Sequence, residues 1–186
     1  MEWLLEMDGQ LLLWLKETFA HPVLDRLMIF ISALGDSGFC WIALAVLFLL
    51  LGMKRTVWRQ RGCLLLLSLA IDALLCNVLL KPLVGRTRPY ELLGYGLLIP
   101  PMDDPSFPSG HTAASFAAAA ALFAMDRRWG IAAYVFAAVM GFSRLYLGVH
   151  FPTDVLAGAL LGIAAAKLAL FLWNKWKDKS ANKSDL

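Results

Sequence analysis

Three short blocks, far apart along the chain, hold most of the residues that could do chemistry. In chain order they are Lys81 with Arg88-Pro89, then Pro108-Ser109-Gly110-His111, then Ser143-Arg144 with His150 and Asp154. Together they supply three cations, two imidazoles and one carboxylate to an otherwise mostly apolar chain. Cations and a helix N-terminus bind phosphate well, and two histidines, one of them backed by an aspartate, could break a phosphate ester. The blocks therefore indicate chemistry on a phosphate group.

Single residues in these blocks have properties that suit such chemistry. An arginine fork meets two phosphate oxygens at once, whereas a lysine contributes a point charge. Ser109 is a good N-cap, and the first-turn N–H groups of the helix that it opens would bind an anion. His150 and Asp154 are four residues apart, so they are expected to share a helix face. A metal site or a structural pair is the alternative for these two, but few further ligands lie nearby in the sequence.

Other polar residues close to the blocks are expected to play smaller parts. Asn77 lies four residues before Lys81 and can support its side chain from one helical turn below. Ser143 could bind phosphate or cap Arg144, and both roles remain open. The acidic pair Asp103-Asp104 is expected to be solvated, although it could repel or position an anionic substrate.

The three blocks resemble the signature of the type 2 phosphatidic acid phosphatase superfamily. The family pattern is a lysine, six residues and Arg-Pro; then Pro-Ser-Gly-His; then Ser-Arg, five residues, a histidine, three residues and an aspartate. Every specified position is matched here in order, and the spans that carry the motifs cover roughly residues 60–170. Each block alone is a weak signal, whereas three in order at these spacings are a strong one.

The resemblance implies a role for each matched residue. His150 would be the nucleophile that forms a phosphohistidine intermediate, and Asp154 would orient its imidazole. His111 would protonate the leaving oxygen and then activate water for the second step. No metal or other cofactor is expected, because cations would neutralise the transferring phosphoryl group. The residues expected to bind phosphate are Lys81, Arg88, Ser109, Gly110 and Arg144.

The elements that must position these residues are expected to lie in a membrane. Of the 186 residues, 60% are hydrophobic, whereas a soluble domain is nearer 45–50% apolar. Open sheet edges are not tolerated in a bilayer, so the fold is expected to be all-α, a single integral membrane helical bundle. The three cysteines lie in apolar runs and are expected to be small buried side chains.

Five apolar runs are expected to be transmembrane helices, which need about 20 apolar residues each. The last two runs fit this length well, whereas the first and third are short and must recruit flanking residues. The runs are Phe39–Met53, Cys63–Leu80, Thr112–Met125, Ile131–Val149 and Val155–Trp173.

The two ends of the chain differ from this core, which is expected to span residues 37–174. Residues 1–36 are interrupted by His21-Pro22 and are expected to form two amphipathic helices in the membrane interface. The alternative is one broken crossing, which would move the N-terminus to the other side. The polar, lysine-rich segment 175–186 is expected to be a disordered cytoplasmic tail.

Basic residues in the loops predict the orientation. They cluster between the first two spans, between the third and fourth, and in the tail: Lys54, Arg55, Arg59, Arg61, Arg127, Arg128, Lys175, Lys177, Lys179 and Lys183. With five spans these regions share one side, and an excess of Lys and Arg is typical of the cytoplasmic side. The helix ends that carry the three blocks then converge on the extracytoplasmic face of the cell membrane, at the depth of lipid headgroups.

The resemblance implies a metal-independent lipid phosphatase whose partners are the bilayer and a lipid phosphate, with no nucleic acid. The preferred substrate is undecaprenyl pyrophosphate, hydrolysed to undecaprenyl phosphate. Phosphatidic acid and phosphatidylglycerol phosphate are alternatives, because the motifs bind a phosphate and say little about the tail. A lipid phosphotransferase of the same fold and a non-catalytic phospholipid-binding or transport protein also remain open, as does the oligomeric state.

Overall fold

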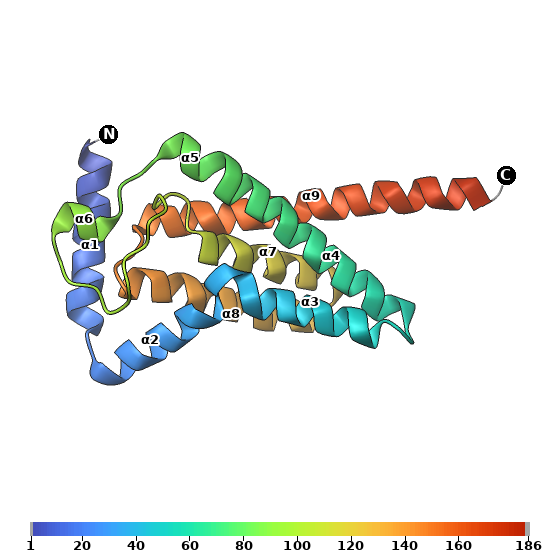
Figure 1. Cartoon of the computed structure of the whole chain (residues 1–186), viewed down its shortest axis with the longest axis horizontal. Coiled ribbons are helices and arrows are strands. Elements are labelled where there is room, and N and C mark those ends of the chain that lie inside the picture. Colours follow the sequence, from blue (N-terminus) through green and yellow to red (C-terminus); the bar gives the residue numbers. More distant parts are fainter. Residues whose placement is uncertain (1, 185–186) are drawn as a thin grey trace.

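The computed structural model describes residues 2–184, and every regular element in this range is helical (Figure 1). The predicted all-α class is therefore confirmed. Met1 and the last two residues of the predicted tail lie outside the described range. The elements are α1 (Glu2–Phe19), α2 (Pro22–Leu34), η1 (Asp36–Gly38), α3 (Phe39–Leu51), α4 (Thr56–Ala73), η2 (Leu74–Leu80), α5 (Lys81–Val84), α6 (Pro89–Leu93), α7 (Gly110–Met125), α8 (Arg127–Tyr146) and α9 (Pro152–Ser184).

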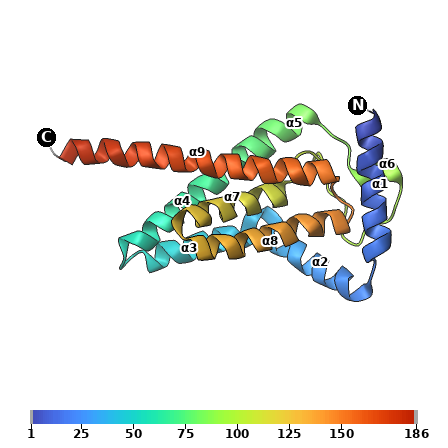
Figure 2. The same cartoon turned by 180° about the vertical axis from the view of Figure 1, so that it is seen from behind.

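Helix α7 forms the centre of the bundle, and α3, α4, α8 and α9 pack around it (Figures 1 and 2). It can be central because it is rich in alanine, and small residues let helix backbones approach closely. The facing positions on α9 are small as well: a Cβ added at Gly162 would lie 2.1 Å from the Ala113 carbonyl oxygen. On the α3 side, Trp41 Nε1 donates to Ser115 Oγ at 3.1 Å. This packing fixes the start of α7, where the Pro-Ser-Gly-His block lies.

A continuous helix runs from Thr56 to Val84 through α4, η2 and α5 (Figure 1). The η2 stretch is π-helical. It ends just before Pro82, which cannot donate a backbone hydrogen bond and crowds the carbonyl four residues earlier, so a wider turn relieves this conflict. The wide turn lies directly before Lys81, so it sets the position of that side chain.

Helix α1 lies across one end of the bundle, roughly perpendicular to α8 and α9 (Figures 1 and 2). It is held there by the fully buried Leu12 and by Asp8, whose side chain is 4% exposed. The next helix, α2, is tied to α8 because the Tyr146 hydroxyl donates to Asp25 at 2.5 Å. Two helices are thus present where two amphipathic helices are predicted, and their location in the membrane interface stays a prediction.

Within residues 2–184, three helical stretches are long and apolar enough to cross a membrane: Thr56–Leu93, Arg127–Tyr146 and Pro152–Lys179. The pair Pro22–Leu34 and Asp36–Leu51, bent by 47°, would make a fourth, and Gly110–Met125 is shorter. Each of the five predicted spans therefore corresponds to a helix, while the number that cross the membrane stays a prediction.

The predicted disorder after Trp173 is wrong for the described residues, because α9 continues as a helix to Ser184. At about 1.5 Å per residue its 33 residues extend about 50 Å, well past the rest of the bundle (Figure 1). No glycine or proline follows Gly162, so nothing in the local sequence stops the helix where the apolar run ends.

Candidate active site

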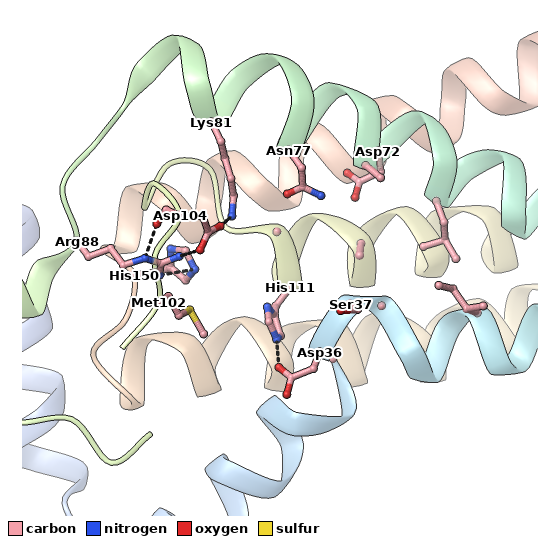
Figure 3. A pocket seen from close by; sticks show the side chains of 17 residues that line it. Asp36, Ser37, Asp72, Asn77, Lys81, Arg88, Met102, Asp104, His111 and His150 are labelled. Atoms are coloured by element: carbon pink, nitrogen blue, oxygen red, sulfur yellow. Dashed lines mark hydrogen bonds and ion pairs between the residues drawn. The ribbon is translucent and has the colours of Figure 1, made fainter. Parts of the chain in front are cut away.

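A cavity of about 600 Å³ lies between α3, α4 and α7, at the end of the bundle that α1 crosses (Figure 3). Six of the residues predicted to form a site line this cavity: Asn77, Lys81, Arg88, Gly110, His111 and His150. These come from η2, α5, α7 and the segments before α6 and α9, so the fold brings together residues from all three sequence blocks. The cavity also extends past them toward the apolar residues Leu69, Ala73 and Ile42 and toward the carboxyl group of Asp72 (Figure 3).

His150 is buried in the segment between α8 and α9, and its two ring nitrogens have different neighbours. Nδ1 lies 3.4 Å from Ser106 Oγ and 3.7 Å from Asp154 Oδ2, and Nε2 lies 3.5 Å from Arg88 Nη1. The prediction that His150 and Asp154 share a helix face is wrong, because α9 begins only at Pro152. The two side chains meet because Asp154 lies in the first turn of α9 and accepts a hydrogen bond at 2.9 Å from the N–H of Phe151.

The environment of His150 keeps its imidazole neutral. Burial is the main cause that lowers its pKa, from 6.5 to about 3. The nearby Arg144 and Arg88 charges lower the pKa further, against the opposing hydrogen bond and charge of Asp154. A neutral imidazole has one unprotonated ring nitrogen, which is the form that can attack phosphorus.

His111, in the first turn of α7, faces the same cavity and contacts Asp36 (Figure 3). Its Nε2 lies 2.9 Å from Asp36 Oδ1 in η1. This approach depends on Gly35, because a Cβ at that position would lie 2.7 Å from His111 Cδ2. The bend between α2 and α3 therefore supplies a carboxylate partner for the second histidine.

Lys81 and Arg88 are not free in this structure, because both bind the carboxylate of Asp104 (Figure 3). Arg88 Nη2 donates to Asp104 Oδ1 at 2.7 Å, and Lys81 binds the other oxygen. Burial alone would raise the pKa of Asp104, but the hydrogen bonds and charges of Lys81 and Arg88 outweigh it and hold the pKa below its ordinary value. The prediction that Asp104 is merely solvated is wrong, although half of its side chain is exposed. One anion already bridges the two cations.

Three residues predicted to bind phosphate or to support the site do not line the cavity: Ser109, Ser143 and Arg144. Arg144 is fully buried, and its guanidinium contacts Ser32 Oγ and, at 3.2 Å, the sulfur of Met102, which lines the cavity. Ser143 Oγ donates to the Met140 carbonyl at 2.7 Å within its own helix, so it neither caps Arg144 nor faces the site.

The N-cap prediction for Ser109 needs a correction as well. Ser109 does occupy the N-cap position of α7, but its side chain makes no capping hydrogen bond. Its Oγ lies 2.9 Å from Thr112 Oγ1, while its N–H donates to the Asp154 carbonyl at 3.1 Å. Gly110 does lie at the cavity, where a Cβ would be 3.4 Å from Asn77 Oδ1 and 3.8 Å from Lys81 Nζ. The start of α7 is thus packed against both the Lys81 and the Asp154 helices.

Comparison with known sequences decides the family. The sequence model of the PAP2 superfamily matches residues 61–178, which contain all three blocks. The chain belongs to the PAP2 superfamily. An undecaprenyl-diphosphatase of Sulfolobus acidocaldarius is 36% identical over 75% of the chain and 66% of that relative. The undecaprenyl-diphosphatase BcrC of Bacillus subtilis is 31% identical over 77% of the chain and 72% of the relative.

A solved PAP2 structure has the same fold along nearly the whole chain. It is the transmembrane phosphatidylglycerolphosphate phosphatase of Bacillus subtilis, with a TM-score of 0.77 and 29% identity over 96% of this chain and 88% of that one. As a member of this family, the chain is an enzyme, a metal-independent lipid phosphatase, and a multi-pass membrane protein.

Three polar residues at the PAP2 site were not predicted from the sequence, because their partners are distant along the chain. Asp36 contacts a histidine 75 positions away, and Ser106 Oγ donates to Asp154 Oδ2 at 2.5 Å across 48 positions. Arg86 Nη1 donates to Asp154 Oδ1 at 2.6 Å across 68 positions. Only Arg86 carries a sequence signal, since it is a further cation between Lys81 and Arg88.

Proposed function

We propose that this lipid phosphatase removes the terminal phosphate of undecaprenyl diphosphate, at the extracytoplasmic face of the cell membrane. The observation that carries the chemistry is that Lys81 and Arg88 together hold an anion beside Nε2 of the neutral His150. The choice of lipid is supported by the two undecaprenyl-diphosphatase relatives.

In the proposed reaction the terminal phosphate takes the place of the Asp104 carboxylate between Lys81 and Arg88. His150 Nε2 attacks the phosphorus, and the bond from phosphorus to the bridging oxygen breaks. His111 gives its proton to that oxygen, which leaves as the lipid monophosphate. His111 then takes a proton from water, the hydroxide attacks the phosphohistidine, and inorganic phosphate leaves with His150 restored. Asp154 stabilises the Nδ1 proton throughout.

The lipid tail is proposed to lie in the apolar extension of the cavity. Leu69 and Ala73 of α4, Ile42 of α3 and Ala114 of α7 line this part. Together they form a largely apolar lining, which Asp72 of α4 interrupts with one carboxyl group. An isoprenoid chain, which has no polar groups, suits such a lining.

The proposed orientation is supported by the position of the basic residues at the opposite end of the bundle. Arg61 lies 3.9 Å from Asp126 in the α7–α8 turn, and Lys177 of α9 donates to Gln60 at 3.4 Å. The three basic regions therefore lie side by side, as the positive-inside rule requires of a single cytoplasmic face. The cavity lies toward the other end.

The test is phosphate release by the purified protein in detergent with a chelator present. Undecaprenyl diphosphate is compared with phosphatidic acid and phosphatidylglycerol phosphate, and His150→Ala is the control. We expect the highest kcat/KM for the diphosphate and no release by the variant. Loss of activity that a divalent metal restores would contradict the metal-free reaction.

Phosphatidylglycerol phosphate is the second candidate, because the solved structure that matches 96% of the chain is a phosphatase for that lipid. A clear preference for it in the same assay would move the protein to phospholipid synthesis. Transfer of the phosphoryl group to another lipid would show as substrate loss without matching phosphate release, and binding without substrate loss would indicate a non-catalytic protein.

A further inference from the structure

Arg86 lies two residues before Arg88 but does not line the cavity. Its guanidinium instead joins two carboxylates from opposite ends of the chain. Nη1 donates to Asp154 Oδ1 at 2.6 Å, and Nη2 donates to Asp8 Oδ2 at 2.8 Å. Its side chain is only 15% exposed, so these pairs are largely shielded from solvent. Arg86 is therefore placed to act on Asp154 and not on a phosphate in the cavity.

The same residue also helps to fix the second oxygen of Asp154. The N–H of Ser106 donates to the Arg86 carbonyl at 2.8 Å, and Ser106 Oγ donates to Asp154 Oδ2 at 2.5 Å. Phe151, whose N–H donates to that oxygen, packs its ring 4.1 Å from Arg86 Cζ. The Arg86 guanidinium thus holds Oδ1 directly, while Oδ2 is held by Ser106 and Phe151, which the Arg86 backbone and guanidinium contact respectively.

Asp8 holds Arg86 from the opposite side. It is a buried carboxylate on the N-terminal helix α1, and such a group is costly unless it is paired and hydrogen-bonded. Besides Arg86 it binds Thr153, whose N–H donates to Asp8 Oδ1 at 3.1 Å. Thr153 directly precedes Asp154 in the first turn of α9. Helix α1, lying across the bundle end in Figure 1, is therefore bound to the turn that carries Asp154.

We propose that Arg86 is a positioning residue that orients Asp154 toward His150, and that Asp8 of α1 is required to keep Arg86 in place. The inference rests on the proposed role of His150 as the nucleophile. One guanidinium can serve two carboxylates in different directions at once, which a lysine ammonium on a flexible stem does less well. The N-terminal helix is then part of the active-site apparatus.

The direct test is the tautomer of His150, read by ¹⁵N NMR of protein labelled in its three histidines. We expect His150 in the wild-type protein to carry its proton on Nδ1, and Arg86→Gln or Asp8→Asn to produce a mixture of tautomers. Asp25→Asn is the matched control, because it removes an equally close contact between α2 and the Tyr146 hydroxyl without touching Asp154. An unchanged His150 signal in both variants overturns the proposal, whether or not any lipid is hydrolysed.

Kinetics with the lipid that the wild-type protein hydrolyses best give the second readout. Removing a group that orients a functional side chain by hydrogen bonding, as measured at metal-ligating histidines, typically costs about 10–100-fold, and we expect kcat to fall by a similar factor in Arg86→Gln and Asp8→Asn. KM and inhibition by inorganic phosphate should stay nearly unchanged, because neither residue lines the cavity. Arg86→Lys should recover little of the loss.

A double-variant comparison separates positioning from a general effect on folding. If Arg86 acts through Asp154, Arg86→Gln should add little loss in an Asp154→Asn background. The same loss in both backgrounds would overturn the proposal, as would a fall in thermal stability large enough to account for the lost activity. Failure of the wild-type protein to hydrolyse any of the three lipids would count against the proposed function alone, since the NMR result stands independently.

Discussion

At the scale of single residues, the phosphate site already holds an anion of the protein's own. The Asp104 carboxylate bridges Lys81 and Arg88, so a substrate phosphate must displace it. Asp104→Asn should therefore lower KM and the inhibition constant of inorganic phosphate. The Asp104 side chain is 49% exposed, and an exposed ion pair is worth up to about 1 kcal/mol, so the expected change is up to about fivefold.

The matched control for this prediction is Asp103→Asn, which removes an equal charge from the exposed neighbouring position. Steady-state kinetics of the two variants separate displacement from general repulsion of an anionic lipid. Equal effects of both substitutions would contradict direct competition by Asp104.

The buried His150 gives a pH dependence of stability. Its pKa in the folded protein is about 3, below the ordinary 6.5, so the unfolded chain binds the extra proton between these values. Its contribution is complete above about pH 6.5, and the free energy of unfolding should fall as the pH drops from there toward 3. Thermal unfolding in detergent should thus show a steeper loss on acidification in the wild-type protein than in His150→Gln. Parallel curves would mean that His150 titrates normally in the fold.

Spacing along the chain identified the residues that line the cavity better than it identified their partners. Lys81, Arg88, His111 and His150 could be predicted because their types and intervals carry the chemistry. Asp104 could not be predicted, because adjacent acids in a loop are usually solvated and only the folded loop places one between two cations. The burial of Arg144 behind Met102 likewise depends on packing that no interval in the sequence expresses.

At the scale of elements, close contact between α7 and α9 positions the two histidine segments relative to each other. A Cβ at Gly162 would lie 2.1 Å from the Ala113 carbonyl, so even Gly162→Ala must push the helices apart. Overpacking typically costs about 1–3 kcal/mol, and we expect a loss of this size in thermal unfolding. Gly96→Ala, at a position with open space around it, should be nearly neutral. Equal stability of both variants would contradict the close packing.

The length and periodicity of the apolar runs predicted the presence of the helices and the position of most of them, because a membrane-spanning helix needs a long apolar run. This pattern of apolar residues has limits at two places. It did not predict the π-helical turn at Leu74–Leu80, which arises from a local conflict with Pro82. It also failed at the end of α9, where polar residues continue a helix that has no stop signal.

At the scale of the whole molecule, the basic end and the cavity end should lie on opposite sides of the membrane. In a background with its three native cysteines replaced by alanine, Glu91→Cys near the cavity and Lys54→Cys at the basic end probe the two sides. An impermeant thiol reagent should label position 91 in intact cells and position 54 only after permeabilisation. The reverse pattern would place the site in the cytoplasm.

The proposed reaction requires that His150 carry the phosphoryl group during turnover. The most direct measurement is rapid acid-free quenching of the purified protein with a lipid diphosphate labelled in its terminal phosphate, followed by mapping of the labelled residue. We predict a transient, acid-labile phosphohistidine at His150 that is absent in His150→Ala. Label on another residue, or full turnover by His150→Ala, would show that His150 is not the nucleophile.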